Sequence, residues 1–254
     1  MRALVCVKRV PLTGGRILLS PDAQELDTAH LGFTISPHEE CGVEEAVRLV
    51  EAHGGESVAL CLGPAEAVEQ LREVMALGID RSIHLVTGTE EWDPQATAAA
   101  IVEAIRADEA ASGPFDLVVL GNESADSGGY QVGIRVAHAL GRPIATGLKG
   151  IVVEGSTVRC EREAGAGRDV YALPLPAVVS VKEGLNLPRF PSVPAKIRAK
   201  QKPVAASEPA RPASRLEKLR LVHPEGQVKQ AEVLGEGAAA APRVVEVLRE
   251  LGVA

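Results

Sequence analysis

The order of hydrophobic and polar residues follows two different periods along the first 182 residues. Short apolar runs rich in β-branched residues predict five strands, at 2–10, 57–63, 82–88, 116–122 and 176–182. Between and after the first four runs, helical spacing predicts four helices, at 37–55, 64–80, 93–110 and 131–143. Strands that alternate with helices are typical of a parallel sheet with helices on both faces. We therefore expect an α/β fold of the Rossmann-like type, doubly wound and mostly parallel.

A third pattern occupies residues 151–175, where apolar and polar residues alternate one by one. Turn-forming residues interrupt the alternation at 154–156 and again at 163–167. A two-residue period around short turns predicts antiparallel strands. We expect this stretch to form an antiparallel ribbon at the edge of the sheet.

The composition changes at residue 183, after which prolines and basic residues are frequent and no core periodicity remains. Such a segment is too polar to fold as a domain of its own. The last residues nevertheless have an amphipathic helical pattern, with apolar Val244, Val245, Val247, Leu248 and Leu251. We expect an α/β domain over 1–185 and, over 186–254, an extended arm that ends in a helix and embraces a partner chain. A disordered linker whose helix folds back on its own domain is the alternative.

The composition narrows the class of protein. Apolar residues make up 46% of the 254 residues and aromatic residues only 2%, so the core must be built from Val, Leu, Ile and Ala. The net charge of -7 argues against a protein that coats nucleic acid. No apolar run reaches the roughly 18 residues of a membrane span, and the N-terminus lacks the features of a secretory leader. We expect a cytoplasmic protein.

No group of residues suggests catalysis or metal binding. The four cysteines, Cys6, Cys41, Cys61 and Cys160, form no C-x-x-C pair and fit no zinc spacing, so we expect buried thiols. The histidines are scattered along the chain, no serine lies in a nucleophile elbow, and no pair of carboxylates stands out. We therefore expect neither catalytic residues nor a metal ion.

The segment 119–133, VLGNESADSGGYQVG, is rich in small and polar residues. A buried strand stops at Gly121, the pair Gly128 and Gly129 follows, and a helix then begins. Free backbone N–H groups and a helix N-terminus together favour an anion, at the strand end where open α/β sheets bind ligands. The pattern is neither G-x-G-x-x-G nor a Walker loop, so a plain strand–helix connection stays open as the alternative.

Two further segments open into helices in a similar way, at 62–63 and at 36–37. If all three junctions meet along one edge of the sheet, they form a nucleotide pocket. A chain with such a pocket, an extended arm and no catalytic residues is typical of one half of a complex.

Several stretches of the sequence also resemble a known family. They are LVCVKRVP (4–11), SPHEECGVEEAVRL (36–49), LGPAEAVEQLREVMALGIDRSIHL (62–85), DLVVLGNESAD (116–126) with QVG (131–133), and LPAVVSVKEGLNLPRFPSVPAKIRAKQKP (175–203). In this order they resemble the beta (small) subunit of electron transfer flavoprotein, over residues 1 to about 203. The last stretch is the most specific of them.

The resemblance implies a heterodimer whose alpha subunit carries the redox FAD. It implies a beta subunit without catalytic residues that binds AMP structurally, or a second FAD in the electron-bifurcating branch of the family. It also implies that electrons pass from dehydrogenases to the flavin and onward to a quinone oxidoreductase or another acceptor. From the residues alone, a nucleotide-hydrolysing or nucleotide-transferring enzyme and a stand-alone nucleotide sensor remain alternatives.

By position, the resemblance assigns residues to the nucleotide. The adenine nucleotide would contact Cys6, Ser36, Pro37, His38, Glu39, Leu62 and Gly63. Its phosphate would lie against Gly121, Asn122, Asp126, Ser127, Gly128, Gly129, Tyr130, Gln131 and Val132. Tyr130 and Val132 depart from the family, which has phosphate-binding Asn and Thr at these positions. The additional Gly would supply backbone N–H donors in place of these side chains.

The resemblance also assigns contacts to partner proteins. The stretch that contains Arg189, Pro191, Val193, Pro194 and Arg198 matches the loop that recognises client dehydrogenases. Val193 stands where the family has a Leu that enters a pocket of the client, and the lost methylene would weaken that anchor by about 1 kcal/mol. Glu163 corresponds to an acid that pairs with an Arg of the alpha subunit.

Overall fold

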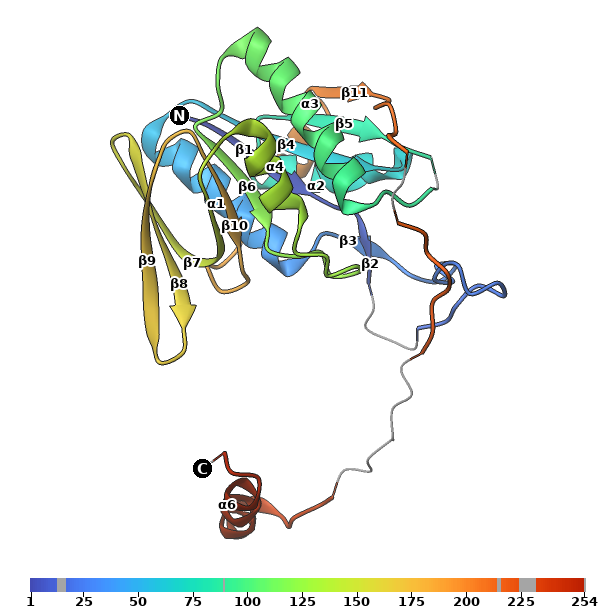
Figure 1. Ribbon diagram of the computed structural model, residues 1–254, viewed down its shortest axis with the longest axis vertical. Helices are drawn as coiled ribbons and strands as arrows, with labels where there is room; N and C mark the ends of the chain where they lie inside the picture. The colour runs from blue at the N-terminus through green and yellow to red at the C-terminus, as the bar shows by residue number, and fades with distance from the viewer. Residues whose placement is uncertain (13–16, 89, 214–215, 224–231, 254) are drawn as a thin grey trace. The chain divides into compact units, whose positions relative to one another are not determined.

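The computed structural model describes residues 1–12, 17–88, 90–213, 216–223 and 232–253. The chain divides into two compact units, Met1–Leu219 and Arg220–Ala254. The first unit contains the sheet and the second contains the C-terminal helix (Figure 1).

A nine-stranded sheet forms the first unit, in the order β11-β5-β4-β1-β6-β10-β7-β8-β9. Its strands are β1 (Arg2–Val7), β4 (Glu56–Gly63), β5 (Arg81–Val86), β6 (Leu117–Gly121), β7 (Ile144–Glu154), β8 (Thr157–Ala164), β9 (Gly167–Pro174), β10 (Ala177–Val181) and β11 (Val204–Ser207). All pairs from β11 to β7 are parallel, and β8 and β9 continue the sheet as antiparallel strands. The predicted doubly wound, mostly parallel fold with an antiparallel edge ribbon is confirmed.

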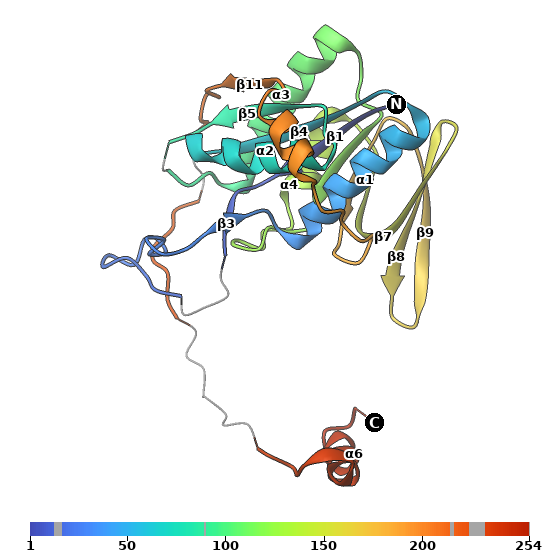
Figure 2. The same ribbon diagram turned by 180° about the vertical axis from the view of Figure 1, so that it is seen from behind.

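Helices cover both faces of this sheet. They are α1 (Pro37–His53), α2 (Val68–Leu77), α3 (Pro94–Ser112), α4 (Val132–Leu140) and α5 (Val193–Ala199), with a 3-10 turn, η1, at Ala65–Ala67. One apolar cluster joins the sheet to α1 and α2, and the other joins it to α3 and α4 (Figures 1 and 2). Neighbouring strand residues divide between the two clusters, Val5 on one face and Leu4 on the other. Both faces are therefore buried, which explains the uninterrupted apolar runs of the central strands.

Two strand boundaries differ from the expected ones. β1 ends at Val7 rather than at residue 10, because the backbone N–H of Lys8 donates to the side chain of Glu39 instead of a neighbouring strand. The chain then forms a small separate sheet from β2 (Val10–Pro11) and β3 (Phe33–Thr34). The first strand of the ribbon, β7, begins at Ile144 rather than at 151, because it first pairs in parallel with β10. Its antiparallel pairing with β8 covers Leu148 to Glu154.

The first part of the expected arm belongs to the sheet unit. β11 pairs in parallel with β5, and Arg72 of α2 donates to the carbonyl oxygens of Ala199 and Lys202 at 2.7 and 2.6 Å. The boundary between the units therefore falls after Leu219, whereas the sequence suggested residue 185. Backbone pairing and charged donors hold this segment in place, so it needs little apolar periodicity of its own.

The second unit contains a 3-10 turn, η2 (Gly237–Ala240), and α6 (Ala241–Glu250). The helix is amphipathic as predicted, and Val244, Val245 and Leu248 are exposed. Among the described residues, no helix has the length and apolar character needed to cross a membrane.

Candidate functional site

The carboxyl ends of β1, β6 and β10 lie next to one another, because these strands are adjacent and parallel. Helix α1 begins at the same edge. Ser36 is its N-cap in an extended conformation, and Pro37 occupies the first turn. The predicted helix start at Ser36 and Pro37 is confirmed.

Glu39 ties the end of β1 to the start of α1. Its buried carboxylate oxygen Oε2 accepts the backbone N–H of Lys8 at 2.9 Å and that of Ser36 at 3.3 Å. Burial raises the pKa of Glu39 to about 8, although the two N–H donors act in the opposite direction. The Cγ of Glu39 lies only 2.9 Å from where a Cβ on Gly121 would be, so the strand end needs glycine for this close approach.

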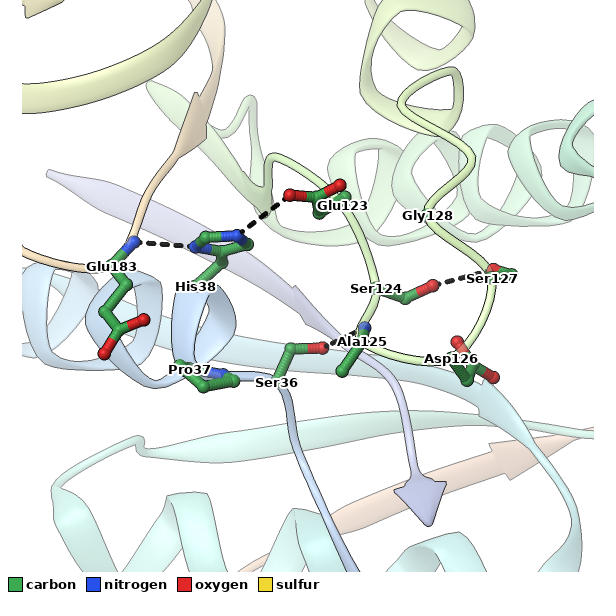
Figure 3. Close-up of a pocket in the computed structure, with 10 residues that line it drawn as sticks. All are labelled: Ser36, Pro37, His38, Glu123, Ser124, Ala125, Asp126, Ser127, Gly128 and Glu183. Carbon is green, nitrogen blue, oxygen red and sulfur yellow. Dashed lines mark hydrogen bonds and ion pairs between the residues drawn. The ribbon is translucent and has the colours of Figure 1, made fainter. Parts of the chain in front are cut away.

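The loop 122–131 connects β6 to α4 and lies over the start of α1 (Figure 3). The hydroxyl of Ser36 accepts the backbone N–H of Ala125 at 3.1 Å. The ammonium of Lys8 pairs with the carboxylate of Asp126 at 2.6 Å. Gly128 has a φ of +56°, which lets the loop turn back toward α4. The middle of the loop is thus held by two contacts from segments far away in sequence.

A cavity of about 470 Å³ lies between this loop and the start of α1. Its lining includes six residues that the sequence assigned to the nucleotide, namely Ser36, Pro37, His38, Asp126, Ser127 and Gly128. Four further lining residues were not assigned, namely Glu123, Ser124, Ala125 and Glu183. The first three lie in the predicted loop, and Glu183 follows β10, the neighbour of β6, so only the strand order would have found it.

Other assigned residues lie near the cavity without lining it. Cys6 and Leu62 belong to the apolar cluster beneath α3 and α4, and burial raises the pKa of Cys6 well above its usual range. Gly63 packs closely against Ala67, where a Cβ would approach the Ala67 side chain to 3.3 Å. The Oδ1 atom of Asn122 accepts the hydroxyl of Ser180 at 3.2 Å. These residues shape the strand ends and make no wall of the cavity.

The residues that open α4 are also turned away from the cavity. The Oε1 atom of Gln131 accepts hydrogen bonds from Arg135 within the same helix, at 3.0 and 3.3 Å. Val132 packs against the apolar cluster beneath the helix. Gly129 and Tyr130 leave their backbone N–H groups without a protein acceptor among the described residues.

Hydrogen-bond donors and carboxylates both occur around this loop. The N–H groups of Gly129 and Tyr130 and the ammonium of Lys8 are donors carried by or attached to the same loop, although none of these three residues lines the cavity. The carboxylates of Glu123, Asp126 and Glu183 line the cavity and would repel additional negative charge.

The cysteines are suited to packing rather than to chemistry. All four are free and buried, as predicted, and burial raises the pKa of Cys61 to about 12 and that of Cys160 to about 11. A thiol with so high a pKa forms almost no thiolate near neutral pH. Within the described ranges, no three His, Cys, Asp or Glu side chains are grouped so as to hold a metal ion.

Comparison with known proteins decides the family. The electron transfer flavoprotein domain matches residues 25–212. The electron transfer flavoprotein subunit beta of Syntrophomonas wolfei is 32% identical over 98% of this chain and 96% of its own length. The corresponding proteins of Bradyrhizobium diazoefficiens and Homo sapiens are 35% and 34% identical, over 89% and 82% of this chain and 91% and 82% of their own lengths.

The chain belongs to the electron transfer flavoprotein beta subunit family. Proteins of this family take part in flavin-dependent electron transport and are not enzymes in the ordinary sense. The match with the family domain extends through α5 and β11, in agreement with their place in the sheet unit.

The family member displays an apolar surface between β10 and α5. Phe190 is 97% exposed and Val193 is 71% exposed, and Leu187 is also exposed. The expected recognition loop is helical from Val193 onward, because Ser192 caps α5 through the backbone N–H of Ala195. The sequence reading did not single out Phe190 or Leu187, although each is an apolar residue beside a proline.

The charged residues assigned to partner contacts differ in their availability. Arg189 is engaged within the chain, because its guanidinium pairs with Glu44 at 2.8 Å and with Glu51 at 2.6 Å. Glu163 lies on the ribbon and pairs with Lys149 at 3.0 Å. Arg198 and Pro194 are exposed on α5, and Pro191 is half-buried.

Proposed function

We propose that this chain is the beta subunit of a heterodimeric electron transfer flavoprotein and binds AMP as a structural ligand. In the proposal, the alpha subunit carries the FAD. Client dehydrogenases dock on the beta subunit, and electrons continue to a quinone oxidoreductase or another acceptor. The beta subunit supplies binding and positioning but no catalytic residue, and the complex works in the cytoplasm.

The observation that carries the proposal is the position of the loop 122–131 over the start of α1. The loop is held there by Ser36 and Lys8 and forms one wall of a cavity of about 470 Å³. Its N–H groups at Gly129 and Tyr130, which are not part of that wall, have no protein acceptor among the described residues. These donors fit a phosphate.

Backbone groups take the place of the family's phosphate-binding side chains in this proposal. Tyr130 and Val132 offer no side-chain hydrogen bond comparable to that of Asn or Thr, and Val132 is packed in the core. The N–H groups of Gly129 and Tyr130, together with the N-terminus of α4, would bind the phosphate oxygens. The ammonium of Lys8 would supply the positive charge.

The docking role is supported by the exposed apolar residues beside α5. Leu187, Phe190 and Val193 would provide the buried contacts with a client, and Arg198 would steer an acidic partner. The ion pairs of Arg189 with α1 would hold this surface in shape. In the same proposal Glu163 contacts the alpha subunit, and the exposed apolar side chains of α6 pack on it.

The test is to purify the chain with a co-expressed alpha subunit, denature the complex, and identify and count the released nucleotides. We expect one FAD and one AMP per heterodimer. The matched control is the alpha subunit expressed alone, which should release FAD and no AMP. Two FAD and no AMP would contradict the proposal in favour of a second flavin site, and one FAD alone would mean that the cavity holds no nucleotide.

A further inference from the structure

One phenylalanine lies almost entirely in solvent. Phe190 is 97% exposed, whereas Phe115 is fully buried and Phe33 is partly covered by Arg9, whose guanidinium lies 3.9 Å from the centre of the ring. Of the large apolar side chains that the structure describes, Phe190 is the most exposed. Neighbouring exposed apolar side chains indicate contact with another protein. We call the four such residues of this stretch the docking surface: Leu187, Phe190, Val193 and Ile197.

The residue before Phe190 is clamped to α1. The Nε and Nη2 atoms of Arg189 donate to the carboxylate of Glu44 at 2.8 and 3.1 Å, and its Nη1 and Nη2 atoms donate to that of Glu51 at 2.6 and 2.9 Å. The backbone N–H of Arg189 also donates to Glu44, at 3.2 Å. Glu44 is buried on α1, so the clamp is attached to a fixed carboxylate. Two paired contacts fix the orientation of a guanidinium, and a lysine cannot reproduce them.

A second contact holds the start of the same segment. The side-chain amide of Asn186 donates to the carbonyl oxygen of Cys41 and to the carboxylate of Glu45, both at 3.0 Å. A proline directly follows each of the two most exposed apolar residues and restricts the backbone of the residue before it. The polar residues of 186–190 thus contact α1 while the apolar ones are exposed. A segment that is already ordered loses less conformational entropy when it binds a partner.

The charges beside the docking surface indicate the kind of partner. Lys196, Arg198 and Lys200 are exposed on α5 or directly after it, and none has an ion pair among the described residues. The chain as a whole has a net charge of -7, so this basic group is local. A complementary partner would present an apolar pocket wide enough for an aromatic ring, with carboxylates at its rim.

We infer that Phe190 is the principal anchor for the client dehydrogenase, and that Arg189 is the positioning residue that presents it. This inference rests on the docking role in the proposed function. The family resemblance assigned the anchor to Val193, but Val193 is smaller and is 71% exposed. An aromatic ring buries more apolar area than a valine and is more often a residue on which binding depends.

The test uses the complete heterodimer and a panel of purified FAD-dependent dehydrogenases, each with its own substrate. The probe is the dehydrogenase that reduces the flavin of the wild-type heterodimer fastest. Its steady-state rate is measured while the concentration of the heterodimer is varied, which gives a KM for the heterodimer and a kcat. Reduction of the same flavin by dithionite needs no docking and reports whether the flavin site is intact.

Four variants separate the roles. Phe190→Ala and Val193→Ala compare the two candidate anchors. Arg189→Lys keeps the positive charge and removes the paired contacts. Arg142→Lys is its control, because Arg142 also pairs with a carboxylate, that of Glu109 at 2.6 Å, and follows α4, which lies on the opposite face of the sheet from α1.

We expect the KM to rise about thirtyfold in Phe190→Ala, at most about fivefold in Val193→Ala and about tenfold in Arg189→Lys, with kcat within about twofold of the wild type. Arg142→Lys should leave both quantities within about twofold. Hydrogen exchange of 186–190 should be faster in Arg189→Lys and unchanged in Arg142→Lys. The KM of the wild type should also rise with salt, because salt screens the basic residues of α5 from an acidic rim.

The outcomes separate the inference from the proposal beneath it. If dithionite reduces the wild-type flavin and no dehydrogenase of the panel does, the proposed docking role fails and the anchor fails with it. If the wild type is reduced but Phe190→Ala raises the KM no more than Val193→Ala, the docking role stands and the anchor is overturned. A KM for Arg189→Lys equal to that for Arg142→Lys, or a change in kcat alone, would overturn the positioning role.

The choice of partner is tested by two further results. A KM that does not change with salt would overturn the acidic rim. Sedimentation of the wild type as a pair of heterodimers, which Phe190→Ala separates, would show that the docking surface binds a second copy of the complex, and the client would be overturned as its occupant.

Discussion

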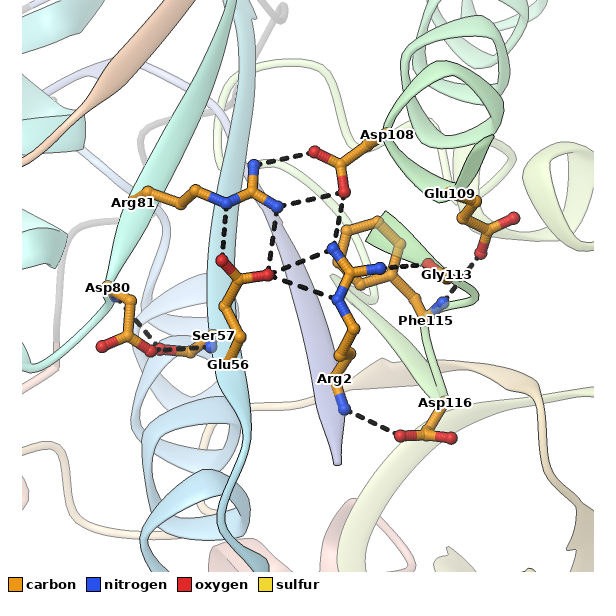
Figure 4. Close-up of polar contacts among 10 residues, drawn as sticks. All are labelled: Arg2, Glu56, Ser57, Asp80, Arg81, Asp108, Glu109, Gly113, Phe115 and Asp116. Atoms are coloured by element: carbon orange, nitrogen blue, oxygen red, sulfur yellow. Dashed lines mark hydrogen bonds and ion pairs between the residues drawn. The ribbon is translucent and has the colours of Figure 1, made fainter. Parts of the chain in front are cut away.

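The parallel strands all begin along one side of the central sheet, here called the amino edge, and all end along the opposite side, the carboxyl edge. These two edges are built in opposite ways. At the amino edge, where the parallel strands begin, Arg2, Arg81, Glu56 and Asp108 form a closed ring of ion pairs (Figure 4). The four pairs have N–O distances of 2.7 to 3.1 Å, and each guanidinium contacts both carboxylates. The ring contains two guanidinium groups and two carboxylates, and each group pairs with both groups of opposite charge.

The carboxyl edge has an excess of carboxylates instead. Glu123, Asp126 and Glu183 line the cavity, and Lys8 is the ammonium paired there. N–H groups of the loop lack protein acceptors among the described residues. The same sheet therefore has one edge whose charges are balanced within the chain and another where, in the proposed function, a ligand binds. Stability should depend mainly on the first edge and binding on the second.

The largest expected effect comes from Gly55→Ala at the amino edge. Gly55 has a φ of +117°, and a Cβ there would lie 1.9 Å from the carbonyl oxygen of Met1. Backbone atoms would have to move, so we expect a loss of at least about 3 kcal/mol in the free energy of unfolding. The measurement is the urea midpoint of the full-length chain.

Gly141→Ala is the control for this substitution. Gly141 has a φ of +66° and no atom within 4 Å of the added Cβ, so its cost should be about 1 kcal/mol, from the left-handed conformation alone. Equal losses for the two variants would mean that the tight contact at the amino edge is not a constraint.

Removal of one member of the ion-pair ring should cause the next largest loss in the free energy of unfolding. Asp108→Ala leaves Arg2 and Arg81 to share Glu56, and all these groups are largely shielded from solvent. We expect a loss of about 2 to 3 kcal/mol, less than for a fully buried pair because some solvent remains in contact. Asp126→Ala, which breaks the more exposed pair with Lys8, should cost under about 1 kcal/mol. The comparison of the two edges fails if both substitutions cost the same.

The strands and most helices could be predicted from sequence because both faces of the sheet are buried. Four consecutive apolar residues, as at 117–120, are all buried when they form a central strand with both faces covered, and few other local structures bury all four. β11 and α5 were missed for the opposite reason. β11 is short and mostly exposed, and its place follows from backbone pairing with β5 rather than from any apolar pattern.

The site was only partly predictable for a different reason. Ser36, Asp126 and Gly128 carry local signals, namely a helix cap, a polar loop and a turn glycine. Glu183 carries none, since it lies 145 residues from His38 and reaches the cavity only through the order of the strands. The pairing of His38 with Glu123 has no local signal either, as the two positions are 85 residues apart.

The contributions of the two edges to stability should depend on pH in opposite ways. Burial raises the pKa of Glu39 to about 8, so the folded chain keeps a proton that the unfolded chain releases near pH 4.5. Its contribution to stability is therefore complete below pH 4.5 and is lost as the pH rises toward 8. Hydrogen bonds from Arg81 and Arg2 hold the pKa of Glu56 below its usual value, so its contribution is present at neutral pH and is lost in acid.

The test of this contrast is Glu39→Gln, whose amide oxygen still accepts the N–H groups of Lys8 and Ser36 but does not titrate. Between pH 5 and 8 the stability of the wild type should fall relative to the variant by up to about 1.4 kcal/mol per pH unit, the slope for one proton. Urea unfolding at each pH measures the difference. Parallel curves for the two proteins would show that Glu39 is ionised in the folded chain and that the carboxyl edge does not oppose the amino edge.

The smallest expected effect on stability is that of Ser127→Ala, in the middle of the loop. The hydroxyl of Ser127 lies 2.8 Å from that of Ser124 and has no other partner among the described residues, and both side chains border the cavity. Exposed loop substitutions usually change the free energy of unfolding by less than about 0.5 kcal/mol, and we expect no more here. The same variant should bind AMP several-fold more weakly, because a hydroxyl beside the phosphate donors is lost. A large loss of stability would mean that the carboxyl edge is part of the folding core, and the division between the two edges would then be wrong.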